Sequence, residues 1–216
     1  MTYCTRPGGH FPNKITPSGV NLVKAQDRKD DPVLAMLPET IETGLIEKSR
    51  QGDRSSFGEL VYHYQQSVVH VVYRMCSDLD LAEDAAQEAF LRAWLHLDSF
   101  QTGSSLRNWL YRIAINVALD RLRREKGTLQ DLETIEVADP AEGPEAELLH
   151  KETRQRVQQA IQSLSEANRA VLVLREYGSL SYQEIAGTLD IPIGTVMSRL
   201  NYARSRVRDL LEIDHD

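Results

Sequence analysis

Residues 180–208 read LSYQEIAGTLDIPIGTVMSRLNYARSRVR, and their spacing predicts two helices joined by a tight turn. Ser181 and Glu184 stand three residues apart, as in a capping box, which satisfies free N–H groups where a helix begins. A first helix is therefore expected from Ser181 to Leu189. Pro192 interrupts it, because proline lacks an N–H and disfavours helical geometry in the residue before it, but proline suits the first turn of a new helix.

The second helix of this pair has one apolar face and one polar, cationic face. Val196, Leu200, Ala203 and Val207 recur at intervals of four, three and four residues, which places them on one stripe that faces a core. Residues 191–208 contain four arginines and no acid, although the whole chain has a net charge of −7. This pattern is typical of a helix-turn-helix whose second helix enters the major groove of DNA. The alternative is an amphipathic hairpin with a solvated arginine face.

Length and composition bound the class of protein. A chain of 216 residues, 41% hydrophobic and 26% charged, has room for one large or two small domains. No apolar run approaches the roughly 18 residues of a membrane helix, and the N-terminus lacks the layout of a signal peptide, so we expect no membrane insertion and a cytoplasmic location. Cys4 and Cys76 are the only cysteines, and they support neither a disulfide framework nor a zinc site.

The charges and prolines divide the chain into four parts. Residues 1–40 contain five of the eight prolines and little periodicity, which predicts a mostly disordered extension or one that becomes ordered only with a partner. Residues 104–127 hold six Lys or Arg and two acids, whereas residues 128–152 hold one Lys and eight acids. We therefore predict an all-α fold of two small helical domains, at 41–126 and 152–213, joined by a flexible acidic linker at 127–151.

Capping signals predict where several helices begin. In the first domain, Ser56 and Glu59 predict a core helix, and Asp80 with Glu83 predicts the start of the next one. A loop then leads into a helix at residues 106–125. In the second domain a helical unit is expected from Glu152, a further helix is expected after a cap at Ser165, and the helix-turn-helix brings the domain to about four helices.

Two faces of the first domain are candidates for binding. Asp84 and Glu88 form a carboxylate pair, but no histidine or third acid shares their face, which favours a partner-binding surface over a metal or catalytic site. The helix at 106–125 places Trp109 beside arginines and asparagines, a combination that suits single-stranded nucleic acid. Trp109 taken alone fits a core position as well. We predict no catalytic residue, metal ligand or cofactor.

Three motifs, in this order, resemble the extracytoplasmic-function group of bacterial sigma factors. The sequence AEDAAQEAFLRAW at residues 82–94 is similar to the region-two helix that binds the polymerase clamp. The segment 100–124, which contains LRNWLYRIAIN, is similar to the strand-opening and minus-ten recognition segment. Residues 180–206 are similar to the region-four helix-turn-helix that reads the minus-thirty-five element. Together the resemblance covers roughly residues 41–211.

The resemblance implies a factor without catalytic chemistry that binds core RNA polymerase and directs promoter-specific initiation. The expected polymerase contacts are Asp84, Gln87, Glu88 and Leu91. The residues expected to meet the unpaired minus-ten strand are Thr102, Ser104, Ser105, Asn108, Trp109, Arg112, Asn116, Arg123 and Arg124. The residues expected at the minus-thirty-five element are Thr195, Met197, Ser198, Arg199, Asn201, Tyr202 and Arg204. Some similar proteins have arginine where this chain has Met197, which cannot make the bidentate contact with guanine, so we infer no promoter sequence.

The implied partners are core RNA polymerase, promoter DNA as duplex and as melted single strand, and an anti-sigma factor. A stand-alone dimeric helix-turn-helix regulator is the alternative, and it leaves the motifs at 82–124 unexplained. A protein-interaction module or a metal enzyme at 41–126 is a further alternative.

Overall fold

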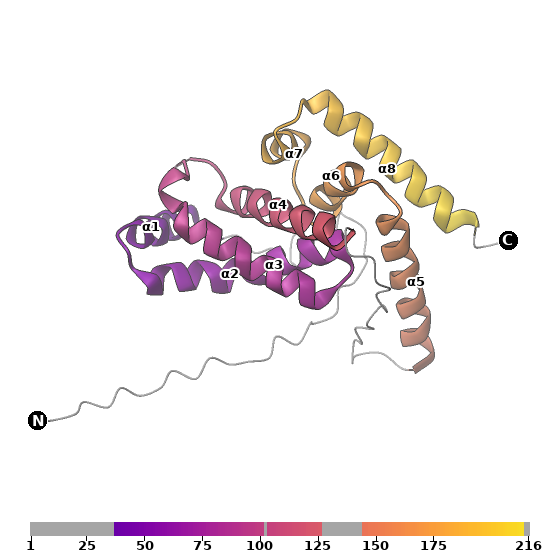
Figure 1. The fold of residues 1–216 in the computed structure, drawn as a ribbon, viewed down its shortest axis with the longest axis horizontal. Coiled ribbons are helices and arrows are strands. Elements are labelled where there is room, and N and C mark those ends of the chain that lie inside the picture. Colours follow the sequence, from indigo (N-terminus) through magenta and orange to yellow (C-terminus); the bar gives the residue numbers. More distant parts are fainter. Residues whose placement is uncertain (1–36, 102, 127–143, 214–216) are drawn as a thin grey trace, which may run out of the picture.

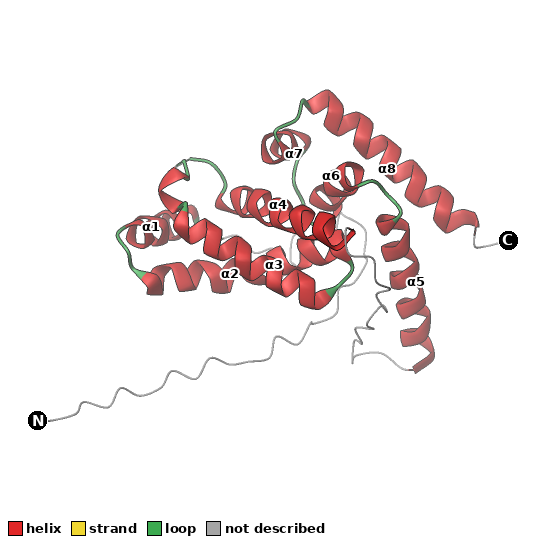
Figure 2. Cartoon of the chain, in the orientation of Figure 1, coloured by secondary structure: helices red, strands yellow, loops and turns green. Residues whose placement is uncertain are grey.

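The structure is a computed structural model that describes residues 37–101, 103–126 and 144–213, and within these ranges it contains helices and no strands (Figure 1, Figure 2). The predicted all-α fold with two helical domains is confirmed. Most of the predicted N-terminal extension and the first part of the predicted linker lie outside the described residues. We call residues 37–126 domain one and residues 144–213 domain two.

Domain one is built around a long central helix. Leu60, Val68, Val71 and Met75 on this helix are at most 2% exposed, because apolar residues recur along its inner face at helical spacing. The other helices of the domain pack against it or against its neighbour. In chain order the elements are α1 (Glu39–Arg50), the central α2 (Arg54–Cys76), α3 (Leu79–Leu95), the short 3₁₀ helix η3 (Leu97–Ser99) and α4 (Leu106–Lys126).

Domain two has the four predicted helices and ends in the helix-turn-helix. Its elements are α5 (Pro144–Gln162), α6 (Glu166–Glu176), α7 (Tyr182–Leu189) and α8 (Ile193–Ile213). Val196, Leu200 and Ala203 of α8 are fully buried, as their spacing predicts. The capping box is confirmed: the Glu184 N–H donates to Ser181 Oγ at 3.3 Å, and the Ser181 N–H donates to Glu184 Oε2 at 2.8 Å.

Two predicted caps in domain one are wrong. The N-cap of α2 is Asp53 rather than Ser56, and its carboxylate accepts from the Ser55 N–H at 3.0 Å. The N-cap of α3 is Asp78 rather than Asp80, and it accepts from the Leu81 N–H at 2.9 Å. In both places an aspartate follows directly on a left-handed residue, and it is the first residue with the extended backbone that an N-cap needs.

Helix α5 also begins earlier than expected. Helix α5 starts at Pro144 instead of near Glu152, so the last residues of the predicted linker are helical. Proline is favoured at the first helical position and acids are favoured in the first turn, and the sequence has Glu145 and Glu147 directly after Pro144. Ser165 occupies the predicted N-cap of α6, but its side chain makes no capping hydrogen bond.

The two domains pack against each other. Figure 1 shows α6 and α7 lying beside the helices of domain one, with α5 and α8 on the outside. In the described residues α2 contacts α5 and α6, and α4 contacts α7. Buried side chains of both domains consequently join in one continuous hydrophobic cluster.

The assignment of the α3 cap predicts the effects of two substitutions two residues apart. Asp78→Ala should lower the free energy of unfolding by about 1 kcal/mol, because it removes the side chain that accepts from the Leu81 N–H. Asp80→Ala should have a smaller effect, since Asp80 lies in the first turn and contributes only through the helix dipole. Urea unfolding followed by circular dichroism measures both, and a larger loss from Asp80→Ala would contradict the assignment.

Candidate docking and nucleic-acid interfaces

Helix α3 presents an exposed stripe that ends in two leucines. Asp84 and Gln87 are exposed and Glu88 is partly buried. Leu91 is 65% exposed, and Leu95, one turn further along, is 74% exposed. Leu95 is not among the residues that we predicted from the sequence, although its spacing of four from Leu91 places it on the same face. Two exposed leucines one turn apart are typical of a surface that another protein covers.

The acids on this stripe are already paired within the chain. Arg121 of α4 lies 3.4 Å from Asp84 Oδ2 and 2.9 Å from Glu88 Oε2, and Arg92 lies 2.5 Å from Glu88 Oε1. The hydrogen bond from Arg121 lowers the pKa of Glu88 below its ordinary value, and the bond from Arg92 adds to this effect. These ion pairs brace α3 against α4. The acids of the stripe therefore contribute to the stability of the fold as well as to the surface. The two leucines form no ion pair and remain available to a partner protein.

The residues predicted to meet a melted strand lie on α4 and on the loop before it. Ser104, Arg112, Asn116, Arg123 and Arg124 are exposed. Ser105, Asn108 and Trp109 are partly buried, and Thr102 lies outside the described residues. We call the eight described residues the minus-ten face; they are Ser104, Ser105, Asn108, Trp109, Arg112, Asn116, Arg123 and Arg124.

The Trp109 side chain is neither fully buried nor fully exposed. It packs against the edge of the hydrophobic cluster and remains partly exposed. The centroid of its ring lies 5.3 Å from that of Phe100, with the two ring planes tilted by 54°. The aromatic pair thus fixes the start of the loop against the first turn of α4.

Arg50, at the end of α1, also holds the start of the loop that leads into α4. Its Nε donates to the Leu97 carbonyl at 3.3 Å, and its Nη2 donates to the Phe100 carbonyl. We did not predict this role from the sequence. The contact joins residues 50 positions apart, and nothing in the local pattern around Arg50 distinguishes it from a solvated arginine at a helix end.

Three members of the minus-ten face contact acids of domain two. Asn108 Nδ2 donates to Glu184 Oε1 at 2.9 Å. The Arg123 Nε lies 3.6 Å from Glu166 Oε2. The Arg112 Nη2 lies 4.0 Å from Asp190 Oδ2. In this arrangement of the domains, part of the predicted strand-binding surface is occupied from within the chain.

The outer surface of α8 carries the residues predicted for duplex DNA. Met197 is 45% and Tyr202 is 59% exposed, and Ser198 and Asn201 are exposed as well. Thr195 and Arg199 are partly buried. Arg204 is bonded to Glu176 of α6 through Nη2 at 2.6 Å and Nε at 3.1 Å. Arg204 therefore braces the second helix of the helix-turn-helix, which is a structural role that the sequence pattern did not indicate.

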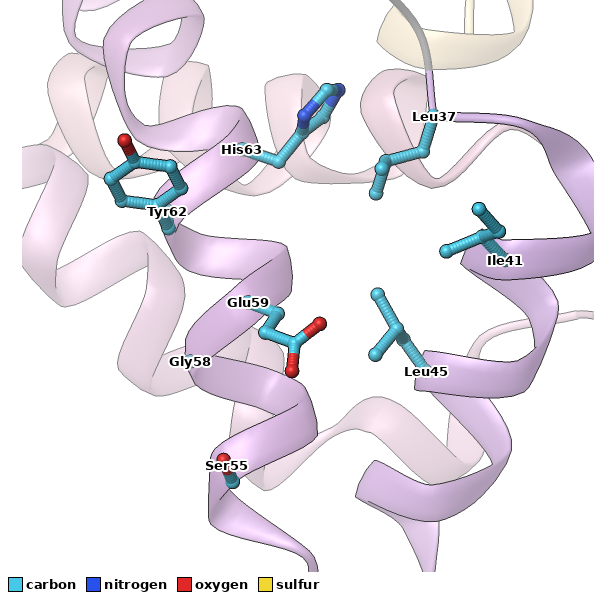
Figure 3. Close-up of a pocket in the computed structure, with 8 residues that line it drawn as sticks. All are labelled: Leu37, Ile41, Leu45, Ser55, Gly58, Glu59, Tyr62 and His63. Atoms are coloured by element: carbon cyan, nitrogen blue, oxygen red, sulfur yellow. The ribbon is translucent and has the colours of Figure 1, made fainter.

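Other surfaces of the molecule contain none of the predicted site residues. A groove of about 350 Å³ lies between α1 and α2, with Leu37, Ile41 and Leu45 facing Glu59, Tyr62 and His63 (Figure 3). In the part of the chain that the structure describes, no group of three or more His, Cys, Asp or Glu side chains could hold a metal ion. None of the described helices is long and apolar enough to cross a membrane.

The pairing of Glu88 predicts a pH-dependent contribution to stability. Because the native pKa lies below the ordinary value of 4.5, the ionised Glu88 stabilises the fold above that pH, and the contribution is lost as the pH falls through the lowered pKa. Near neutral pH, Glu88→Gln should cost about 1 kcal/mol in the free energy of unfolding, and below the lowered pKa it should cost much less. Most of the difference should disappear in an Arg121→Gln background. A cost that is independent of pH would contradict this role.

Known families match the two domains in order. The chain matches the family model of Sigma-70 region 2 over residues 60–128 and the model of Sigma-70, region 4 over residues 154–207. The RNA polymerase sigma-H factor of Pseudomonas aeruginosa is 37% identical over 187 residues, which are 82% of this chain and 97% of that protein. The ECF RNA polymerase sigma-E factor of Escherichia coli is 39% identical over 173 residues, which are 76% of this chain and 90% of that protein.

Two solved structures share the fold at lower identity. CnrH in complex with the cytosolic domain of CnrY has a TM-score of 0.63 and 24% identity, and the match covers 81% of this chain and 99% of that one. The sigma factor RpoE in complex with the anti-sigma factor NepR from Bartonella quintana has a TM-score of 0.60 and 24% identity, with coverage of 74% and 98%. The identity, coverage and order of the matched regions show that the chain belongs to the extracytoplasmic-function sigma factors, which bind core RNA polymerase and direct the initiation of transcription at promoters.

Proposed function

We propose that the stripe on α3, which ends in Leu91 and Leu95, is the surface that docks on core RNA polymerase. The observation that carries this proposal is the exposure of both leucines, at 65% and 74%, beside the predicted contacts Asp84 and Gln87. Apolar anchors surrounded by polar residues are typical of the energetic centre of a protein interface. The carboxylates of Asp84 and Glu88 add electrostatic complementarity to a basic partner surface, which mainly favours the rate of association and specificity.

The docking proposal is tested with the two leucines, because charge reversal of Asp84 and Glu88 would also break their pairing with Arg121. Leu91→Ala/Leu95→Ala should weaken the binding of core polymerase at least about tenfold, since two leucines no longer become buried. Ile41→Ala is the matched control, because Ile41 is a 51% exposed aliphatic residue on another face. Equal affinities of both variants, measured by fluorescence anisotropy with labelled protein, would sink the proposal.

We also propose that the minus-ten face binds bases as the promoter duplex opens. Exposed arginines follow the phosphates, the partly exposed ring of Trp109 stacks with a base, and the amides of Asn108 and Asn116 hydrogen-bond to base edges. Arg50 is a positioning residue for this face, because it fixes the carbonyls of Leu97 and Phe100 at the base of the loop. Its effect on DNA is transmitted through the loop.

Arg50→Ala should slow promoter opening about tenfold without weakening the docking on core polymerase, because hydrogen bonds from a charged donor hold the loop in place. Open-complex formation on a promoter DNA is followed by the fluorescence of 2-aminopurine in the melted region, at a temperature at which circular dichroism shows the variant to be folded. Arg54→Ala serves as the control, since Arg54 is exposed at the start of α2. An unchanged opening rate for Arg50→Ala would refute the positioning role.

Helix α8 reads the minus-thirty-five element in this proposal. The side chains of Met197, Ser198, Asn201 and Tyr202 reach the major groove, and Arg199 with Arg206 contacts phosphates, which makes binding depend on salt. Because Met197 cannot form the bidentate contact with guanine, sequence preference rests on the amide of Asn201 and on the hydroxyls of Ser198 and Tyr202. Thr195 joins these side chains at the start of the helix, and Arg204 near its middle holds α8 in position through its ion pair with Glu176.

We further propose that the protein acts in the cytoplasm by binding rather than by catalysis, and that an anti-sigma factor regulates it. CnrH and RpoE, which share the fold, were solved with CnrY and with the anti-sigma factor NepR respectively. The exposed apolar groups of α3 and the open outer face of α8 are surfaces that such a partner would cover. A stand-alone dimeric regulator, by contrast, has no use for the stripe on α3.

A further inference from the structure

Two apolar side chains are exposed in the first turns of α8, the second helix of the helix-turn-helix. Ile193 is 41% and Met197 is 45% exposed. Among the described residues, neither side chain belongs to the hydrophobic cluster or packs against it. Because they are four residues apart, they lie next to each other on the surface of the helix. We call Ile193 and Met197 the apolar pair; they form a patch that the described part of the chain leaves open.

The backbone that carries the apolar pair is fixed from the inner side of α8. Val196 lies between the two residues in sequence and is fully buried. The Pro192 carbonyl accepts from the N–H groups of Thr195 at 2.9 Å and of Val196 at 3.2 Å, which closes the first turn of the helix. The apolar pair is therefore held on the N-terminal part of α8, which is the part that a helix-turn-helix presents to base edges.

The surroundings of the apolar pair fit DNA better than a protein partner. Residues 191–208 contain four arginines and no acid, whereas the centre of a protein interface is depleted of charged residues. Asn201 is exposed four residues beyond Met197 and continues the same row along the helix. Ser198 Oγ donates to the Thr195 carbonyl at 3.1 Å, which leaves the hydroxyl oxygen as an acceptor. The apolar pair thus lies within a cationic face that also offers hydrogen bonds.

The major groove contains one apolar group, the C5-methyl group of thymine. The other three bases present hydrogen-bond donors and acceptors there. The Ile193 side chain has no polar atom, and the thioether of Met197 is only a weak acceptor. Contact between these side chains and a methyl group removes apolar surface of both partners from water. The chemistry of the apolar pair therefore favours thymine, whereas an arginine at position 197 would favour guanine.

We propose that Ile193 and Met197 recognise thymine through its methyl group, and that Met197 thereby determines the base that this chain prefers at one position of its upstream promoter element. The inference rests on the proposed function, the reading of the minus-thirty-five element by α8, and it names the chemical group that is read. Asn201, Ser198 and Tyr202 contribute hydrogen bonds to this reading. The apolar pair contributes a contact that only thymine can make.

The test compares thymine with deoxyuridine, which forms the same base pair and lacks only the methyl group. The holoenzyme of the full-length chain and core polymerase selects duplexes from a random library, with core polymerase alone as the background. Each thymine of the most enriched duplex is then replaced by deoxyuridine in turn, and fluorescence anisotropy measures the affinity of the holoenzyme. At one or two thymines of the upstream element, replacement should weaken binding about fourfold each, because one methyl group is no longer buried.

Substitutions in the apolar pair assign the methyl contact. Ile193→Ala/Met197→Ala should bind the thymine and deoxyuridine duplexes equally, because the side chains that cover the methyl group are removed. Ile41→Ala is the control, since Ile41 is a 51% exposed aliphatic residue of domain one, and it should keep the fourfold difference. In a new selection, Met197→Arg should replace the preferred thymine by guanine. An unchanged thymine preference in Met197→Arg would overturn the role of Met197.

The arginine variant Arg199→Ala/Arg206→Ala separates the two ways in which the account can fail. If deoxyuridine is tolerated at every thymine, while the arginine variant still weakens binding of the enriched duplex, reading of the methyl group is refuted and DNA binding by α8 survives. The apolar pair would then be left for a protein partner. If neither the arginine variant nor Ile193→Ala/Met197→Ala changes the affinity for the enriched duplex, α8 does not read it, and this inference fails together with the proposed function.

Discussion

The last carbonyls of α2 have no hydrogen-bond partner within their own helix, and the arrangement of the two domains depends on how these carbonyls are paired. A helix end that is not solvated needs donors from elsewhere, and domain two provides them through Gln162 and Arg169. Because Arg169 also donates to the carbonyls of Gln162 and Leu164, the same guanidinium closes the turn between α5 and α6 and joins the two domains. The position of α7 above α4 follows from this junction.

The candidate surfaces differ in how many of their charged and polar groups are paired with other residues of the same chain. On α3 the acids are paired with arginines, and the exposed leucines remain for a partner. On α4 several of the polar groups are held by acids of domain two. On α8 the outer side chains are exposed, while Arg204 is bonded to Glu176. The surfaces thus differ in availability: the outer face of α8 and the leucines of α3 are exposed, whereas Asn108, Arg112 and Arg123 of the minus-ten face contact acids of domain two.

Local patterns were sufficient to predict the fold class and the helix-turn-helix. The capping box at Ser181 and Glu184 and the apolar stripe of α8 are set by residues close in sequence, and both are confirmed. The caps of α2 and α3 were misplaced because several residues near each helix start can accept from backbone N–H groups, and the choice depends on which of them has an extended backbone. The start of α5 could not be predicted, because the acidic composition of the segment suits a linker and a helix N-terminus equally well.

The parts of the candidate sites that depend on distant contacts could not be predicted. Nothing near Arg50 reveals that it binds the carbonyls of Leu97 and Phe100, and nothing near Asp84 reveals Arg121 as its partner. Leu95 differs from these, because its spacing of four residues from Leu91 places it on the same face of α3. Contacts across the domains, such as the one between Arg74 and Gln158, join residues 84 positions apart and follow only from the fold.

The most direct test of the central claim is to map transcript 5′ ends made on fragmented genomic DNA of the source bacterium by its core polymerase, with and without the purified chain. The account predicts a set of start sites that depend on the chain and share two upstream sequence elements at a fixed spacing, one for each domain. The absence of any start site that depends on the chain, with core polymerase shown to be active on nicked DNA, would contradict it.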